Sequence, residues 1–221
     1  MALPAKDIKR HLKLFTVELI AAAVIFIVSA LMFAVITNEV ILEKETSFDI
    51  KVYDIFTSFI SPLKTNVALV FSFIGSEYFL VPVYLIAIGY FIKIKKYRFA
   101  VLITAVALIS ISSGLLLKVI FHRARPLLPL VVANGYSFPS GHSISGFTFS
   151  GLAIYIVWQS SLRVYAKWLL SVVFFFLGVF IALSRIYLRV HYASDVFGGL
   201  LLTATWLSLS FIAMRYFEKK V

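Results

Sequence analysis

The sequence predicts an all-α integral membrane protein, with six transmembrane helices in a single domain that spans residues 1–221. Hydrophobic residues make up 62% of the chain, and the mean hydropathy is +0.99. Charged residues make up only 14%, against about 25% in an average soluble domain. The apolar residues gather in runs long enough to cross the roughly 30 Å hydrocarbon core of a bilayer. Cysteine is absent, so the sequence indicates no disulfide framework.

Six apolar runs, each bounded by polar or basic residues, are the predicted spans. The first run is too long for the apolar region of a cleavable signal peptide, which is about 7–15 residues. The fourth is short and contains small residues, which allow helices to pack closely. The predicted spans are Leu14–Ile36, Val67–Ile92, Phe99–Phe121, Ser143–Val157, Trp168–Tyr187 and a last one that follows the turn Arg185–Asp195 and runs to about Phe217.

A segment of mixed polarity, Thr37–Asn66, separates the first span from the second. Charged residues of both signs alternate there with apolar residues that recur at helical spacing. This pattern is typical of a short amphipathic helix that lies on the membrane surface. Its apolar positions are Phe48, Val52, Ile55, Phe56, Phe59 and Ile60.

Basic residues cluster at the N-terminus, at residues 93–98, at residues 163–167 and at the C-terminus. The positive-inside rule places all four clusters in the cytoplasm, and six spans satisfy every assignment. The opposite face then carries Thr37–Asn66, His122–His142 and Leu188–Asp195, which is the periplasmic or extracellular side of an inner (plasma) membrane. The net charge of +11 lies in these short clusters and not in a long tract, so nucleic acid is not an expected partner.

The polar residues on the predicted outer face have the chemistry of a phosphate site. Lys118, Arg125 and Arg185 supply three cations, which suit a phosphate dianion. Ser140 and Gly141 precede a predicted helix, whose first backbone N–H groups can point at an anion. We therefore expect these five residues to bind one anionic group.

Two histidines and an aspartate add reactive groups to this site. His191 and Asp195 are four residues apart and share one face of a helix. A carboxylate that orients an imidazole makes its other ring nitrogen a good nucleophile or base. His142 then stands on the opposite wall as the acid that protonates a leaving oxygen. The set predicts phosphoryl transfer through a phosphohistidine, with the cations stabilising charge on the equatorial oxygens.

Two other interpretations apply to these charged residues. Charged side chains at the ends of spans often serve as interfacial anchors, but that role explains a single residue better than a group that converges on one face. A metal site is the second interpretation. However, no acidic pair accompanies the histidines, and three nearby cations would repel a divalent ion. We therefore expect neither a metal nor another cofactor.

The three polar clusters together resemble the signature of the type 2 phosphatidic acid phosphatase superfamily. The motifs are Lys118 with six residues before Arg125-Pro126, then Pro139-Ser140-Gly141-His142, then Ser184-Arg185 with five residues before His191 and three more before Asp195. They match in order and spacing, and the six-span layout matches as well, so the resemblance covers most of the chain. It implies an all-helical core shared with the soluble vanadium haloperoxidases, although this hydrophobic chain is unlike a soluble haloperoxidase.

The resemblance also implies a role for each matched residue. His191 is implied to be the nucleophile, Asp195 the residue that orients it, and His142 the general acid. The implied ligands of the substrate phosphate, acting without a metal ion, are Lys118, Arg125, Ser140, Gly141 and Arg185. On this resemblance the protein is expected to be a lipid phosphate phosphatase with its active site on the extracytoplasmic side.

The expected partners are the bilayer and a membrane lipid phosphate, whose tail lies between spans. The candidate substrates are undecaprenyl pyrophosphate, phosphatidylglycerophosphate and phosphatidate, with lipid A 1-phosphate as a further one. A lipid phosphotransferase is an alternative enzyme. A non-catalytic membrane scaffold or transporter is an alternative of another class, but it requires a dispensable catalytic residue and none is substituted here. No obligatory protein partner is evident.

Several polar residues near the motifs fall outside the signature. Glu77 is a candidate for tuning substrate choice, or else a solvated carboxylate at a helix end. His122 and Arg123 occupy positions that the first motif leaves open, and a structural or loop role is expected for both. Arg189 and Tyr187 either contact the lipid headgroup or anchor the chain at the interface.

Overall fold

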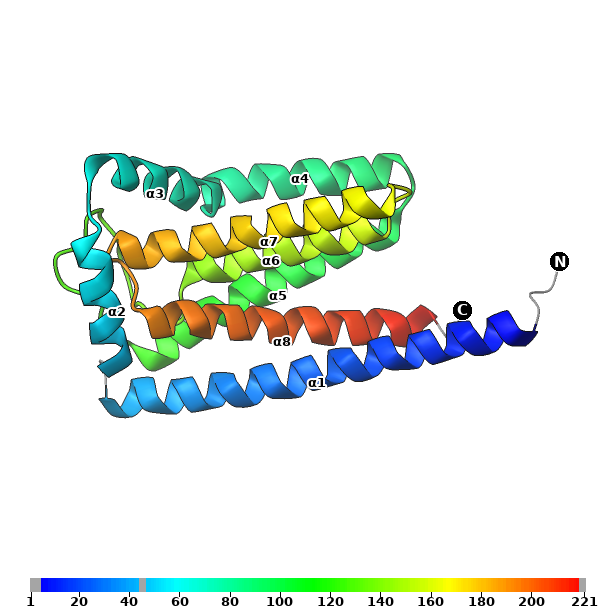
Figure 1. Ribbon diagram of the computed structural model, residues 1–221, viewed down its shortest axis with the longest axis horizontal. Coiled ribbons are helices and arrows are strands. Elements are labelled where there is room, and N and C mark those ends of the chain that lie inside the picture. Colours follow the sequence, from blue (N-terminus) through cyan, green and yellow to red (C-terminus); the bar gives the residue numbers. More distant parts are fainter. Residues whose placement is uncertain (1–4, 44–46, 219–221) are drawn as a thin grey trace.

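The computed structural model describes residues 5–43 and 47–218, and within these ranges the chain is all helical without a strand. The helices are α1 (Ala5–Glu43), α2 (Ser47–Ser58), α3 (Pro62–Ile74), α4 (Glu77–Lys93), α5 (Tyr97–Phe121), α6 (Gly141–Trp158), α7 (Val164–Tyr187) and α8 (Ala193–Glu218). Helix α2 lies across one end of the bundle, and the other helices run roughly along the long axis of the molecule (Figure 1).

Four of the described helices are long and apolar enough to cross a membrane. They are α1 over Val17–Val40, α5, α7, and α8 over Ala193–Arg215. Helices α3 and α4 pass the same test as a pair that bends by 41° at its break. The predicted all-α membrane fold is confirmed by these helices, while the number of six spans stays a prediction.

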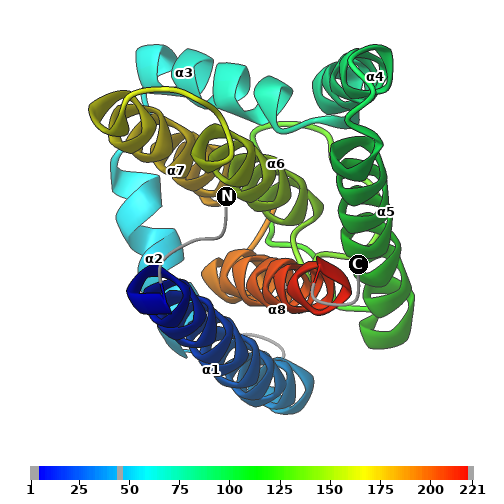
Figure 2. The ribbon, with the colours of Figure 1, turned by 90° about the vertical axis from the view of Figure 1, so that its right-hand side faces the viewer.

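Helix α6 corresponds to the predicted fourth span but is not among the candidates set by length and composition. It packs against α5, α7 and α8 and lies near the middle of the bundle when the molecule is viewed along its axis (Figure 2). Its polar residues Ser143, Thr148 and Ser150 are buried inside the protein. An interior helix can carry such residues because its neighbours, and not lipid, surround it.

The predicted second span is broken into α3 and α4 at Gly75 and Ser76. The break is held against the bundle, because Ser145 Oγ donates a hydrogen bond of 2.7 Å to the Gly75 carbonyl. A Cβ atom at Gly75 would lie 2.3 Å from Ile181 Cγ2, so only glycine allows this close approach to α7. The break between α3 and α4 therefore lies beside the start of α6, where several of the predicted site residues lie.

Helix α2 matches the predicted amphipathic segment. Val52 and Phe56 pack against a buried cluster that contains Ile186, Ala193 and Val196. These contacts fix α2 on the junction between α7 and α8, because one apolar face of the short helix is covered by the bundle.

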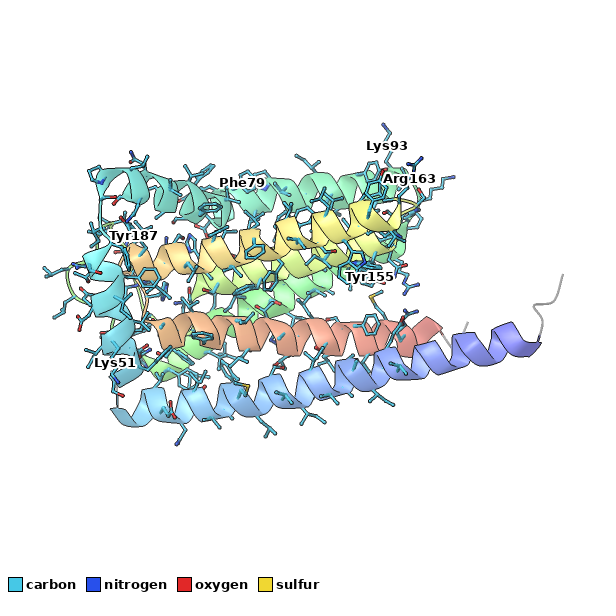
Figure 3. All side chains as sticks on the ribbon, in the orientation of Figure 1. Lys51, Phe79, Lys93, Tyr155, Arg163 and Tyr187 are labelled. Atoms are coloured by element: carbon cyan, nitrogen blue, oxygen red, sulfur yellow. The ribbon has the colours of Figure 1, made fainter. Side chains whose placement is uncertain are left out.

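The two ends of the bundle differ in what they carry. Lys51 and Tyr187 lie at the end crossed by α2, and Lys93 and Arg163 lie at the opposite end (Figure 3). Helix α1 begins and α8 ends on the side of Lys93 and Arg163 (Figure 1). The basic loops that were predicted to be cytoplasmic thus share one end, and the α7–α8 turn lies at the other.

Candidate active site

The three predicted clusters meet at the end of the bundle that α2 crosses. Backbone hydrogen bonds join them: Ser137 N donates to the Arg123 carbonyl at 2.9 Å, and Ser140 N donates to the Asp195 carbonyl at 3.0 Å. The side chain of Arg125 adds a link to the α7–α8 turn, since its Nη1 donates to the Val190 carbonyl at 2.7 Å. The segment between α5 and α6 is therefore tied directly to the turn that carries the predicted nucleophile.

His191 lies at the centre of this junction and is 3% exposed. Its Nε2 faces Arg125 Nη1 at 3.2 Å, and its Nδ1 faces Asp195 Oδ2 at 3.3 Å. A guanidinium can only donate, so Nε2 is assigned as the acceptor and Nδ1 as the nitrogen that carries the proton. Burial lowers the pKa of His191 to about 4, although Asp195 opposes this change. The imidazole is neutral at neutral pH, with its lone pair directed into the site.

Asp195 stands on the first turn of α8 and is fully buried. One carboxylate oxygen, Oδ2, accepts from Tyr192 N at 2.8 Å in addition to facing His191. The other, Oδ1, accepts from Arg123 Nη1 at 2.6 Å and from Ser137 Oγ at 3.5 Å. Both oxygens are therefore engaged, and the carboxylate has a fixed orientation relative to the imidazole.

The three predicted cations are held by oxygen atoms of the protein. Lys118 Nζ donates to the Tyr136 carbonyl at 2.6 Å, and Arg125 Nε donates to the Gly135 carbonyl at 2.9 Å. Arg185 Nη1 donates to Ser72 Oγ. The Nε of Arg185 is buried without a hydrogen-bond partner in the described structure. A buried guanidinium N–H in this position is suited to an oxygen of an anionic ligand, because leaving it unpaired is costly.

Ser140 and Gly141 form the start of α6, as predicted, but their roles differ. The Ser140 side chain is fully buried and accepts from Ser143 Oγ at 3.0 Å and from Ser143 N at 3.4 Å, as an N-cap. Since its own N–H donates to the Asp195 carbonyl, Ser140 joins the start of α6 to the first turn of α8. Gly141 faces Lys118, whose Cε would lie 3.9 Å from a Cβ added there. The N-terminus of α6, with its favourable dipole for an anion, thus adjoins the lysine.

His142 stands on the first turn of α6. It lines a cavity of about 280 Å³ together with Lys118, Gly141 and Glu77. It also interacts electrostatically with Arg125, Arg185 and His191, and with the backbone of Ser72 through a hydrogen bond. The structure therefore brings every predicted catalytic and cationic residue into one site.

The same cavity continues along an apolar wall between α4, α5 and α6. Glu77 is exposed at its mouth, next to the break between α3 and α4. The apolar lining residues are Leu80, Val81, Tyr84, Ile111, Leu115 and Ile144. A cavity with charges at one end and apolar side chains along its length fits an amphiphile with an anionic headgroup.

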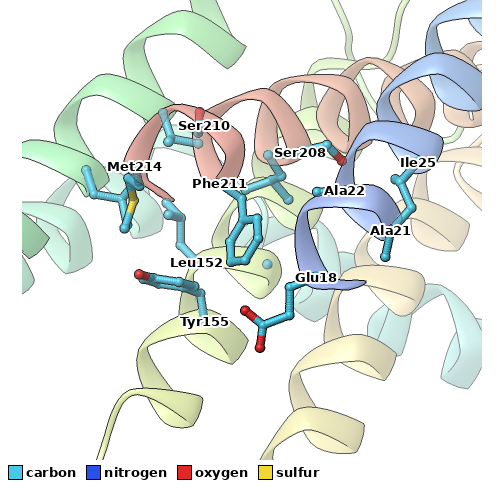
Figure 4. Close-up of a pocket in the computed structure, with 14 residues that line it drawn as sticks. Glu18, Ala21, Ala22, Ile25, Leu152, Tyr155, Ser208, Ser210, Phe211 and Met214 are labelled. Carbon is cyan, nitrogen blue, oxygen red and sulfur yellow. The ribbon is translucent and has the colours of Figure 1, made fainter. Parts of the chain in front are cut away.

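Two further cavities lie apart from these residues. One, of about 380 Å³, is lined by Glu18, Tyr155, Phe211 and other residues of α1, α5, α6 and α8 (Figure 4). The other, of about 860 Å³, lies between α5 and α8 next to Tyr97 and Arg98. Neither contains one of the predicted site residues, so the smaller cavity beside His142 is the one associated with the chemistry.

Residues outside the signature make contacts with neighbouring elements, and one of them also reaches the site. His122 is exposed and makes an edge-to-face contact with Tyr136 at a ring distance of 4.5 Å, in agreement with a loop role. Arg189 Nη2 donates to Thr57 of α2 at 2.7 Å. Arg123 is 6% exposed and reaches the carboxylate of Asp195. The sequence alone did not indicate this contact.

Asp49 was also missed, although a signal for it existed. It is 1% exposed and pairs with Arg123 at 2.8 Å. It precedes Val52 and Phe56 by three and seven residues, so it shares the buried face of α2. An acidic residue in register with the apolar positions of an amphipathic helix indicates a buried partner.

The donor set of the site suits an anion. Among the residues that the structure describes, no group of three or more histidine, cysteine, aspartate or glutamate side chains could hold a metal ion. His191 has one carboxylate partner and lies next to Arg125, and Lys118 and Arg185 complete the cationic side. This arrangement of donors suits an anionic ligand better than a metal ion.

Comparison with known proteins gives the family. The model of the PAP2 superfamily matches residues 97–219, which include every motif residue, and the chain belongs to this family. A relative, phosphatidylglycerophosphatase B of Bacillus subtilis (strain 168), is 32% identical over 107 residues. That match covers 48% of this chain and 51% of the relative, so the chain spans about half the length of this relative.

Two solved structures share the fold. The PAP2-type phosphatidylglycerolphosphate phosphatase of Bacillus subtilis has a TM-score of 0.77 and 25% identity, and the match covers 88% of this chain and 96% of that one. LpxE of Aquifex aeolicus has a TM-score of 0.62 and 20% identity, over 76% of this chain and 98% of that one. These results confirm the predicted family and the all-helical membrane fold.

Proposed function

We propose that the protein is a metal-independent lipid phosphatase that acts through a phosphohistidine on His191. The observation that carries this proposal is the buried His191–Asp195 pair, in which Nδ1 faces the carboxylate at 3.3 Å and Nε2 faces Arg125. The imidazole is thereby oriented and neutral, and the lone pair on Nε2 points at Arg125, one of the cations that would hold a phosphate.

The first step forms the covalent intermediate. An incoming phosphate takes over the hydrogen bond that Arg125 now donates to Nε2, which frees the lone pair for in-line attack on phosphorus. The N–P bond forms as the P–O bond to the lipid breaks, and His142 gives its proton to the leaving oxygen. Asp195 stabilises the positive charge that develops on the imidazole ring.

The second step returns the enzyme to its starting state. Water attacks the phosphorus of phosphohistidine and gives a proton to His142, while the N–P electron pair returns to Nε2 and phosphate leaves. Lys118, Arg125, Arg185 and the N-terminus of α6 stabilise the charge on the equatorial oxygens in both transition states. Such preorganised donors are typically worth about 10²–10³-fold each in kcat.

We also propose how the chain crosses the membrane. A single domain crosses an inner (plasma) membrane six times, with α3 and α4 as one broken span and α6 as an interior span. Both termini are cytoplasmic, and the end with α2 and the active site faces the extracytoplasmic side. The grouping of Lys93 and Arg163 at the end opposite α2 supports this orientation through the positive-inside rule (Figure 3).

Phosphatidylglycerophosphate is the first substrate to test, because a curated relative and a solved structure that resemble this chain are named for its dephosphorylation. The apolar wall of the cavity beside His142 supports a substrate with an acyl or prenyl tail. Undecaprenyl pyrophosphate, phosphatidate and lipid A 1-phosphate share this chemistry and belong in the same panel.

The test is phosphate release by the detergent-purified protein from that panel, with EDTA present throughout. The His191→Ala variant serves as the control for contaminating phosphatases. We expect release that EDTA does not abolish and that the variant lacks. Release that is lost in EDTA would contradict the metal-independent mechanism. Consumption of substrate without free phosphate, seen only when an acceptor lipid is added, would indicate a phosphotransferase instead.

A further inference from the structure

A chain of buried ionic contacts runs from the surface helix α2 to the nucleophile. Asp49 Oδ2 accepts from Arg123 Nη2 at 2.8 Å, and Arg123 Nη1 donates to Asp195 Oδ1 at 2.6 Å. Asp195 Oδ2 in turn faces His191 Nδ1 at 3.3 Å. The side chains of Asp49 and Asp195 are 0% exposed and that of Arg123 is 4% exposed. Three charged groups therefore lie behind the catalytic imidazole, out of reach of the substrate.

Asp49 has a second set of contacts at the start of α8. Its Oδ1 accepts from Ser194 N at 2.8 Å, and its Oδ2 accepts from Ser194 Oγ at 2.6 Å. Arg123 Nη1 also donates to Ser194 Oγ, at 2.7 Å. The carboxylate of Asp49 thus binds the first turn of the helix that carries Asp195, where a negative charge is favourable. One residue of α2 holds both the guanidinium and the helix end.

These contacts determine how the catalytic carboxylate is oriented. Because Arg123 holds Oδ1, rotation of the Asp195 side chain would break a short charge-assisted hydrogen bond, and Oδ2 stays on Nδ1 of His191. The guanidinium also lies 4.4 Å from the centre of the Tyr192 ring, so its own position is fixed by the neighbouring residue. Buried ionic groups keep such geometry only when all partners are present, because a lone buried charge is costly.

We propose that Arg123 and Asp49 are positioning residues of the phosphatase reaction, which act on His191 through Asp195. This inference rests on the proposed function. Neither residue touches the substrate: Arg123 fixes the carboxylate, and Asp49 fixes Arg123 and the start of α8. The short helix α2 is accordingly a part of the catalytic framework as well as a surface element.

The test compares four variants by kcat, KM and thermal stability with the preferred lipid of the panel. Arg123→Gln removes the guanidinium, Arg123→Lys keeps a charge, and Asp49→Asn removes the outer carboxylate. Arg189→Gln is the matched control, because Arg189 also joins the α7–α8 turn to α2, through Thr57 at 2.7 Å, without an ionic link to Asp195. Loss of a supporting partner of this kind typically costs roughly 10–100-fold in activity.

We expect Arg123→Gln to lower kcat by about 10–100-fold with KM changed by less than about 3-fold, as for an outer partner of a catalytic group. Arg123→Lys should recover part of the loss, and Asp49→Asn should lie between Arg123→Lys and Arg123→Gln. Arg189→Gln should keep kcat within about 2-fold even where it lowers the melting temperature, as is usual for a residue outside the reacting groups.

A double-mutant cycle separates positioning from a general effect on folding. In an Asp195→Asn background, Arg123→Gln should change kcat by less than about 3-fold, because its effect is transmitted through the carboxylate that is already lost. Independent effects that multiply would overturn the proposal, and so would an Arg123→Lys or Asp49→Asn enzyme with wild-type kcat. The two milder variants keep the test decisive if Arg123→Gln does not fold.

The same measurements separate an error in the role of Arg123 and Asp49 from an error in the proposed function. If the wild-type protein releases no phosphate from any lipid, the proposed function fails first. If the wild type is active and the Arg123 variants lose only thermal stability, as Arg189→Gln does, then Arg123 and Asp49 are structural and the inference is wrong.

Discussion

The two walls of the site differ in how completely the protein itself satisfies their polar groups. On the wall with His191 and Asp195, both carboxylate oxygens and both ring nitrogens have partners, and the side chains are buried. On the wall with His142 and Glu77, the side chains border an open cavity of about 280 Å³. The first wall is fixed before a substrate arrives, whereas the second has room to adapt to one.

This difference assigns different tasks to the two walls. A preorganised wall lowers the barrier, because its dipoles and charges need no rearrangement when charge develops. A wall with open space discriminates between substrates, since the shape and polarity of a cavity set which group fits it. Mutations on the buried wall should therefore change kcat, and mutations of a cavity residue that takes no part in the reaction, such as Glu77, should change the ranking of lipids.

The largest effect is expected for His191→Ala. The side chain provides the lone pair that attacks phosphorus in the proposed mechanism, so its loss should abolish turnover. Single-turnover phosphate release, followed with the enzyme in excess over the lipid, is the measurement. A burst of product from the variant at the wild-type amplitude would show that another group forms the covalent intermediate.

The next effect is expected for Asp195→Asn. An amide can donate to Nδ1 and favour the wrong tautomer, so kcat should fall by about 10³–10⁴-fold, as for other orienting carboxylates. The variant should remain folded but less stable, because Arg123 loses a buried ionic partner while Asp49 keeps its charge paired. Steady-state rates and thermal unfolding in detergent measure both quantities. An unchanged kcat would mean that Asp195 is only structural.

A smaller effect is expected on the pH dependence of stability, because His191 is buried. In the folded protein the pKa of His191 is lowered to about 4, below its ordinary value near 6.5, chiefly by burial. The unfolded chain therefore binds the extra proton at a higher pH than the folded chain does. The free energy of unfolding should fall as the pH drops from about 6.5 through 4.

Carboxylates also titrate in this pH range, so the contribution of His191 must be separated from theirs by comparing the wild type with a variant. Thermal unfolding of the wild type and of His191→Gln is followed between pH 4 and 7, and the two curves are subtracted. The difference should shrink in acid, because only the wild type carries the buried imidazole. A difference that is independent of pH would contradict the lowered pKa.

Much of the site could be predicted from the sequence because its residues lie at the ends of long apolar runs. Parity of the spans placed Lys118, His142 and His191 on one face, and the structure brings them together. Helical spacing likewise predicted α2. These features are local, since they depend on the order of residues along the chain and on the thickness of a bilayer.

The contacts that could not be predicted are those between distant elements. Asp49 and Arg123 are 74 positions apart, and their pairing depends on how α2 packs on the α7–α8 junction. The bend between α3 and α4 depends on the contact of Gly75 with Ile181 of α7. Ser140 was expected to present its N–H to phosphate, but that group donates to the Asp195 carbonyl. Packing decided each of these cases.

The smallest expected effect lies on the open wall, at Glu77. Its carboxylate stands exposed at the mouth of the cavity, so it should repel a second anionic group on a headgroup and leave the reacting phosphate unaffected. Glu77→Gln should raise kcat/KM for a pyrophosphate lipid relative to phosphatidate by about 2–5-fold, in line with the modest energy of exposed charges. Competition assays with both lipids in one vesicle measure this ratio directly. An equal change in kcat for both lipids would place Glu77 with the buried wall and its catalytic task, and the division between the two walls would then be wrong.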